Sequence, residues 1–165
     1  MVINGKLSLA LIALVSACAG EDPQRSAADT SASPTIAAAG QSAGQDLYQR
    51  CVSCHQANGE GLPGSFPPLA GSEYAIAANT SVPIQIVIRG IQGTLTVKGV
   101  QYNGVMPAYG LGIEMSDDEV AAVLTHVRSS WGNNAPAITP QEVAAVRAQA
   151  AGKPAVTAEE LAPLL

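Results

Sequence analysis

The feature that most constrains this 165-residue chain is the run Cys51-Val52-Ser53-Cys54-His55. Its two thiols are three positions apart, so on a helical turn they lie on one face, with the imidazole of His55 beside them. Each thiol can add to one vinyl group of a porphyrin, and the imidazole can then bind the iron through one ring nitrogen while the other donates a hydrogen bond. The pattern C-x-x-C-H is typical of a covalent attachment site for a c-type haem.

Other uses of a C-x-x-C pair fit the rest of the chain poorly. A zinc site needs more cysteine or histidine ligands, and the only others in the chain are Cys18 and His126. A thioredoxin-like dithiol sits at a strand–helix junction in a β-α-β pattern, and no such pattern is visible. With Cys51 and Cys54 assigned to haem and Cys18 to the role described next, no disulfide remains to be made.

The first residues have the pattern of an export signal. Lys6 precedes an apolar run over residues 7–15, which is too short to span a bilayer comfortably. The run ends in Val15-Ser16-Ala17-Cys18, which resembles the lipobox of bacterial lipoproteins, where cleavage occurs before a cysteine that is then diacylated. The resemblance implies a signal peptide over residues 1–17 and a lipid anchor at Cys18, on the periplasmic side of a bacterial membrane. The alternatives are an uncleaved membrane helix and an ordinary signal peptide with an incidental cysteine.

Three regions follow the signal. Residues 18–42 are rich in Ala, Ser, Thr, Gly and Pro, so we expect a flexible linker behind the lipid anchor. Residues 43–133 form the predicted haem domain, which is small for a self-sufficient core, so a porphyrin would supply much of the apolar interior. Residues 134–165 are predicted to be a C-terminal extension with one short helix, and its tail from Ala155 onward is expected to be loosely held.

The predicted haem domain reads mainly as helix. The first helix is expected over residues 44–55, and a Gly/Pro-rich loop follows over residues 58–71. Residues 82–91 have apolar side chains at helical spacing, although their β-branched content equally suits a short buried strand. Loose alternation over residues 95–102, around Lys98-Gly99, indicates a small hairpin.

Two helix starts are marked by capping boxes. Ser116 is the expected cap of a helix over residues 116–130, with Glu119 as its reciprocal partner. Thr139 and Glu142 repeat the pattern, with a proline at the first helical position. Both helices are therefore predicted to begin at defined residues.

Haem iron needs a second axial ligand or an open site, and the candidates are Met106, Met115 and His126. Met115 fits better as a packed residue, since it forms a hydrophobic staple with Val120. His126 lies in the middle of the terminal helix, where a histidine is more often a surface or interface residue than a ligand. Met106 lies in a segment with no regular pattern, where glycines let the backbone approach the porphyrin. Its neutral thioether favours reduced iron and raises the potential, so we assign Met106 as the ligand opposite His55.

Four motifs follow one another along the chain, and their order is more specific than any one of them alone. They are C-x-x-C-H at residues 51–55, then Phe66-Pro67-Pro68-Leu69-Ala70-Gly71, then Tyr102-Asn103-Gly104-Val105-Met106-Pro107, then Ser116-Asp117-Asp118-Glu119. In this order the chain, from about Gly44 to Trp131, resembles a class I bacterial cytochrome c. The resemblance implies an all-α fold of three to five helices around one covalently bound haem c, with the small hairpin between helices.

Several residue roles are implied by the same resemblance. The backbone carbonyl of Pro67 is expected to accept a hydrogen bond from His55, and Leu69 to pack on the haem. The first and last helices of the domain are expected to cross. The propionates have three candidate donors whose alternative role is ordinary packing: Arg89, Tyr102 and Trp131.

The predicted function is one-electron transfer in the cell envelope, by a carrier that is not an enzyme. The alternatives are a fixed cytochrome subunit of a periplasmic dehydrogenase, nitrite reductase or oxidase complex, and a haem enzyme or gas sensor with Met106 displaced. The formal charge is −5. The acidic cluster at residues 114–119 suits either a solvated helix cap or a docking patch for a basic redox partner. The expected partners are redox proteins and the membrane, and nothing basic or aromatic-rich indicates nucleic acid.

Overall fold

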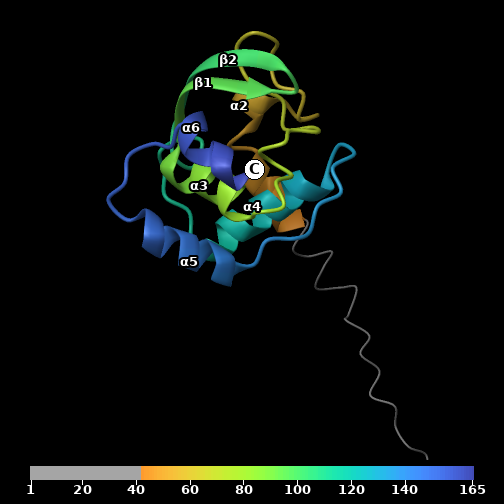
Figure 1. Cartoon of the computed structure of the whole chain (residues 1–165). Coiled ribbons are helices and arrows are strands. Elements are labelled where there is room, and N and C mark those ends of the chain that lie inside the picture. Colours follow the sequence, from red (N-terminus) through yellow and green to blue (C-terminus); the bar gives the residue numbers. More distant parts are fainter. Residues whose placement is uncertain (1–41) are drawn as a thin grey trace, which may run out of the picture. The chain divides into compact units, whose positions relative to one another are not determined.

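The computed structural model describes residues 42–165, so the predicted signal peptide, Cys18 and most of the predicted linker lie outside the described residues. Within residues 42–165, no helix is both long and apolar enough to cross a membrane. The described chain is mainly helical, with one small antiparallel sheet, as the predicted fold class requires (Figure 1). Its elements are a helix over residues 42–48, α2 (Val52–His55), α3 (Ser81–Arg89), β1 (Ile91–Val97), β2 (Val100–Met106), α4 (Asp117–Ser129), α5 (Pro140–Ala150), α6 (Ala158–Leu161) and the 3-10 helix η1 (Ala162–Leu164).

The first predicted helix, over residues 44–55, is wrong as a single element. It is interrupted by a turn over residues 49–51, where backbone bonds such as Cys51 N–H to Tyr48 O span three residues. Tightening of this kind is common where an α-helix changes course. The haem motif consequently begins in the turn and ends in the short helix α2.

The helix over residues 42–48 crosses α4 closely. A Cβ placed on Gly44 would contact the carbonyl oxygen of Ala122 and would lie 2.9 Å from the Cβ of His126. The N-termini of α4 and α5 have the predicted capping boxes, at Ser116 and Thr139. The first core cluster joins these helices and α3 through buried side chains: Tyr48, Ala75, Ile84, Ile88, Met115, Val120, Ala121, Val123, Leu124, Val127, Ile138, Val143, Val146 and Ala150.

The hairpin is longer than the sequence indicated. β1 and β2 pair in register from Val97 with Val100 to Ile91 with Met106. Lys98 and Gly99 both have positive φ, at 52° and 78°, as the favoured two-residue turn of a β-hairpin requires. Met106 therefore ends a strand, and the expectation that it lies in an irregular loop is wrong.

The C-terminal tail is not loosely held. Val156 forms a parallel bridge with Ile91, and α6 packs against β1. Val156 and Leu161 are fully buried in a second core cluster with side chains of the hairpin, whose members are Tyr74, Ala77, Val82, Ile91, Leu95, Val97, Tyr102, Val156 and Leu161. The tail is held because Val156 adds one backbone bridge to β1 and, with Leu161, buries two apolar side chains in the same cluster.

Candidate functional site

A cavity of about 460 Å³ lies between the haem motif and the hairpin. Most of its wall is apolar, and Arg50 is the only charged side chain among the residues that line it. The wall is contributed by the C-x-x-C-H turn, residues 64–75, α3, both strands, residues 106–110 and α4. Such a space suits a flat apolar ligand with its polar edge turned outward.

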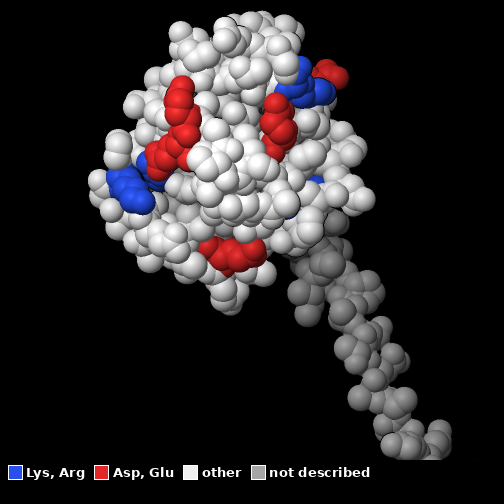
Figure 2. All heavy atoms as spheres, in the orientation of Figure 1, with Lys and Arg blue, Asp and Glu red and all other residues white. Residues whose placement is uncertain are grey.

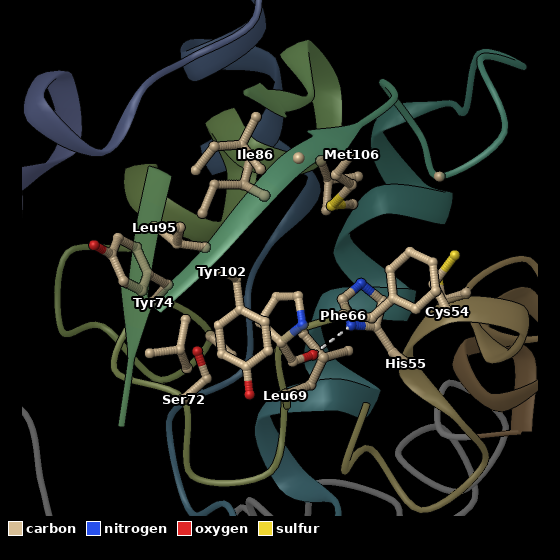
Figure 3. Close-up of a pocket in the computed structure, with 18 of the residues that line it drawn as sticks. Cys54, His55, Phe66, Leu69, Ser72, Tyr74, Ile86, Leu95, Tyr102 and Met106 are labelled. Atoms are coloured by element: carbon tan, nitrogen blue, oxygen red, sulfur yellow. Dashed lines mark hydrogen bonds between the residues drawn. The ribbon is translucent and has the colours of Figure 1, made fainter. Parts of the chain in front are cut away.

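His55 is fixed in the wall of this cavity. Its ring is buried, and Nδ1 lies 2.9 Å from the carbonyl oxygen of Pro67 (Figure 3). Because a carbonyl can only accept, Nδ1 carries the hydrogen and Nε2 keeps its lone pair. Burial lowers the pKa of His55, with a smaller opposing effect of the Pro67 bond, so the imidazole is neutral at physiological pH. A neutral ring with a fixed tautomer is what a metal requires from histidine.

The two thiols of the motif line the same cavity. Cys51 and Cys54 are free and half-buried. Burial, together with the neighbouring Cys54, raises the pKa of Cys51 to about 11, so this sulfur is a neutral thiol rather than a thiolate. No group of three or more His, Cys, Asp or Glu side chains suited to a metal ion occurs in the described part of the chain. Both thiols therefore border the space in which the edge of a porphyrin would lie.

Met106 borders the cavity from the end of β2. Its side chain is half-buried, and Figure 3 shows the sulfur turned into the pocket, across from the ring of His55. Met115 also borders the cavity, but it is 3 % exposed and belongs to the first core cluster, as a staple residue does. His126 is not among the lining residues, and its ring packs against Tyr48 and Trp131 at centroid distances of 5.5 and 5.7 Å.

The loop that carries Pro67 and Leu69 is held from both sides. Leu69 lines the cavity, and its N–H donates to the carbonyl of Gly59 at 2.7 Å. Asn133 donates from Nδ2 to the carbonyls of Leu69 and Val127 and accepts from the N–H of Gly71. Sequence reasoning missed Asn133, because a lone Asn behind a helix carries no signal of a buried bridge.

The three candidate propionate donors have different surroundings. The guanidinium of Arg89 forms a bidentate pair with Glu160, at 2.7 and 2.9 Å, and does not line the cavity. Trp131 donates from its indole to the carbonyl of Ala57 at 3.1 Å and also lies outside the wall. Tyr102 reaches into the pocket from β2 (Figure 3). Arg89 and Trp131 therefore already have polar partners within the protein, and Arg50 is a lining cation that the sequence did not single out.

The acidic cluster at residues 114–119 is largely used within the chain. Asp117 pairs with Arg147 at 2.7 Å, Glu114 lies 3.4 Å from the same guanidinium, and Glu119 caps α4. Figure 2 shows the charges of one face as small separate groups on a mostly uncharged surface. These contacts favour the solvated helix cap over a docking patch.

Comparison with known proteins gives a consistent picture. The family profile described as cytochrome c matches residues 41–131. The chain is similar to cytochrome c-552 of Thermus thermophilus, with 43% identity over 96 residues, covering 56% of this chain and 71% of that protein. It is also similar to the cytochrome c subunit of a quinone alcohol dehydrogenase from Gluconacetobacter polyoxogenes, at 33% identity over 107 residues, and to the gluconate 2-dehydrogenase cytochrome c subunit of Pantoea cypripedii, at 35% over 108. The matches cover 63% of this chain in both cases, but only 22% and 24% of those subunits.

Proposed function

The chain belongs to the cytochrome c family, and on that premise we propose that it is a one-electron carrier of the cell envelope whose haem iron is bound by His55 and Met106. Covalently bound haem c is its cofactor and electron transfer its activity. The observation that carries the ligand assignment is the arrangement of one cavity: both thiols, the fixed ring of His55 and the sulfur of Met106 border it.

The residues of the site suit a haem iron with protein ligands at both of its remaining positions. When bound, the haem supplies a one-electron couple at its iron. Cys51 and Cys54 would hold the porphyrin edge, and Pro67 would keep the Nε2 lone pair of His55 directed into the cavity. Met106 would fill the opposite position with a soft, neutral ligand that favours the reduced state. With both positions filled, substrates would be kept from the metal, which favours electron transfer over the enzyme or gas-sensor alternative.

Replacing Met106 by alanine tests this assignment. The ferric wild-type protein should show the weak far-red band of methionine ligation, and the ferrous protein should bind carbon monoxide slowly at neutral pH. Met106→Ala should lose the band, bind carbon monoxide rapidly and have a lower potential, because the thioether is gone.

Met115→Leu is the matched control, since it removes the other cavity methionine while nearly conserving volume. It should keep the band and the potential of the wild type. Loss of the band in Met115→Leu but not in Met106→Ala would assign the ligand to Met115 instead. Rapid carbon monoxide binding by the wild type would contradict the carrier function itself.

We further propose that the carrier is exported and tethered by a lipid. The support is the sequence of residues 1–18, an apolar run that ends in a lipobox-like Cys18, followed by a linker long enough to separate the domain from the membrane. The mature N-terminus should be a diacylated Cys18 by mass spectrometry, and Cys18→Ser should move the protein to the soluble fraction. A mature chain that begins at another residue would refute the anchor.

The second candidate is a fixed cytochrome subunit of an envelope dehydrogenase. It is favoured by the similarity to cytochrome subunits of alcohol, gluconate and fructose dehydrogenases. The chain spans only about a quarter or less of the subunits concerned, so the similarity covers one haem domain rather than the assembly. Purification from detergent-solubilised membranes decides between the two: a carrier elutes alone, and a subunit elutes with a dehydrogenase.

A further inference from the structure

The segment after Met106 has no helix or strand of its own until α4 begins. It runs from Pro107 to Ser116 and borders the cavity at Pro107, Tyr109, Gly110 and Met115. Tyr109 has a φ of +55°, a conformation that a non-glycine residue keeps only when its surroundings hold it. Whatever holds Tyr109 therefore also limits the movement of Met106, three residues earlier.

Tyr109 is held at both ends. Its N–H donates to the carbonyl of Val87 on α3 at 2.6 Å, and its hydroxyl accepts a hydrogen bond from Arg147 at 2.7 Å. The guanidinium of Arg147 also lies 5.8 Å from the centre of the Tyr109 ring, within the range of a cation–π contact.

Arg147 binds the rest of the segment as well. Nη2 donates to the carbonyl of Met115 at 2.8 Å, and Nε donates to Asp117 at 2.7 Å. One planar guanidinium thus fixes Tyr109 relative to the start of α4, which the single ammonium of a lysine cannot do in the same geometry. Arg147 lies on α5, beyond the residues 41–131 that match the cytochrome c family.

The same C-terminal region supports Met106 from the other side. The N–H of Val156 donates to the carbonyl of Gly90 at 3.0 Å, and Gly90 packs so closely on Met106 that an added Cβ would meet the Met106 carbonyl. The backbone of Met106 is therefore confined before the loop begins. The remaining freedom of its side chain depends on the loop that Tyr109 and Arg147 hold.

We propose that Arg147 is a positioning residue for the Met106 ligand: by fixing Tyr109, it keeps the Met106 sulfur on the iron. This inference rests on the proposed function, in which Met106 is the axial ligand. A charge-assisted hydrogen bond lost from a half-buried site should make the sulfur leave the iron about tenfold more often.

Two variants of the holoprotein test the role. Arg147→Met removes the guanidinium and keeps an unbranched apolar chain, and Tyr109→Phe removes only the hydroxyl that Arg147 binds. Tyr109→Phe should bind carbon monoxide in the ferrous state about tenfold faster than the wild type, as expected for one lost charge-assisted bond. Arg147→Met should bind it at least as fast as Tyr109→Phe, because it also loses the bonds to Met115 and Asp117. Both should also lose the ferric far-red band on heating well before the whole fold unfolds. Tyr109→Phe keeps the test decisive should Arg147→Met fail to fold.

Thr139→Ala is the control for a purely structural effect. It removes the N-cap of α5 but no contact to the loop after Met106. It should lower the temperatures of band loss and of unfolding together and leave carbon monoxide binding unchanged. If Arg147→Met or Tyr109→Phe behaves like Thr139→Ala, or binds carbon monoxide as slowly as the wild type, the positioning role is wrong.

The outcome also separates this inference from the ligand assignment. If Met106→Ala keeps the far-red band, the proposed ligand fails, and the role of Arg147 fails with it. If Met106→Ala loses the band while Arg147→Met and Tyr109→Phe retain wild-type carbon monoxide binding, only the positioning role fails.

Discussion

Replacing Leu161 by alanine tests whether the last residues belong to the core. Leu161 has no exposed surface and packs in the cluster that joins α6 to the hairpin. The substitution removes three carbon atoms, which at about 0.8 kcal/mol each costs about 2.4 kcal/mol of transfer free energy. The cavity left behind adds to this, so the free energy of unfolding should fall by about 2–5 kcal/mol.

Leu165→Ala provides a control of identical chemistry four residues later. Leu165 is 53 % exposed, so its truncation should change the free energy of unfolding by less than about 0.5 kcal/mol. Guanidinium unfolding of the holoproteins, followed by far-ultraviolet circular dichroism, gives both values, and Leu161→Ala should shift the midpoint by roughly 1 M. Equal midpoints for the two variants would show that the tail does not pack on β1 and would refute the reasoning.

Two further changes probe the helices. Gly44→Ala should lower the melting temperature, because overpacking against the Ala122 carbonyl costs about 1–3 kcal/mol and outweighs a helix-propensity gain of about 1 kcal/mol. Gln45 is exposed, so the control Gln45→Ala should not lower the melting temperature. A Gly44→Ala variant more stable than the wild type would contradict the close crossing of the first helix and α4. Hydrogen bonds from the backbone and side chain of Thr139 lower the pKa of Glu142 in the folded protein. The charged carboxylate of Glu142 therefore stabilises the fold at pH values above the unfolded pKa of a glutamate, about 4.3. This stabilisation is lost as the pH falls through the lower pKa of the folded state. Unfolding free energies of wild type and Glu142→Gln should therefore converge between about pH 6 and about pH 3, and a constant difference would contradict the assignment.

What could be read from the sequence was mostly local. The capping boxes at Ser116 and Thr139 were predicted correctly because their partners lie three residues away. For residues 82–91 the sequence allowed either a helix or a short buried strand, and the structure has a helix over residues 81–89. Val82 and Ile84 pack in different core clusters, as residues two positions apart can do on a helix but not on one face of a strand. The hairpin turn at Lys98-Gly99 was visible, but the full length of the strands was not, since their ends pair only in the folded chain.

Contacts between distant residues escaped the sequence. Arg128 is 1 % exposed, and its guanidinium donates to the carbonyls of Ala75, Ala77 and Pro136. Nothing in a helix of mixed composition distinguishes such an arginine from a surface residue. The pair of Arg89 with Glu160 was missed for the same reason, because its members are 71 residues apart.

Local spacing was enough to predict the haem c cofactor, and it names the residues that would attach it, since Cys51, Cys54 and His55 lie within five consecutive positions. The sequence also named Met106 as the candidate second ligand. The surroundings of that methionine became visible only in the folded chain: Met106 lies at the end of a strand, beside Gly90, ahead of a loop that Arg147 holds from the C-terminal extension. The position of a side chain across a cavity depends on packing between segments far apart in the chain, and no local sequence pattern encodes that packing.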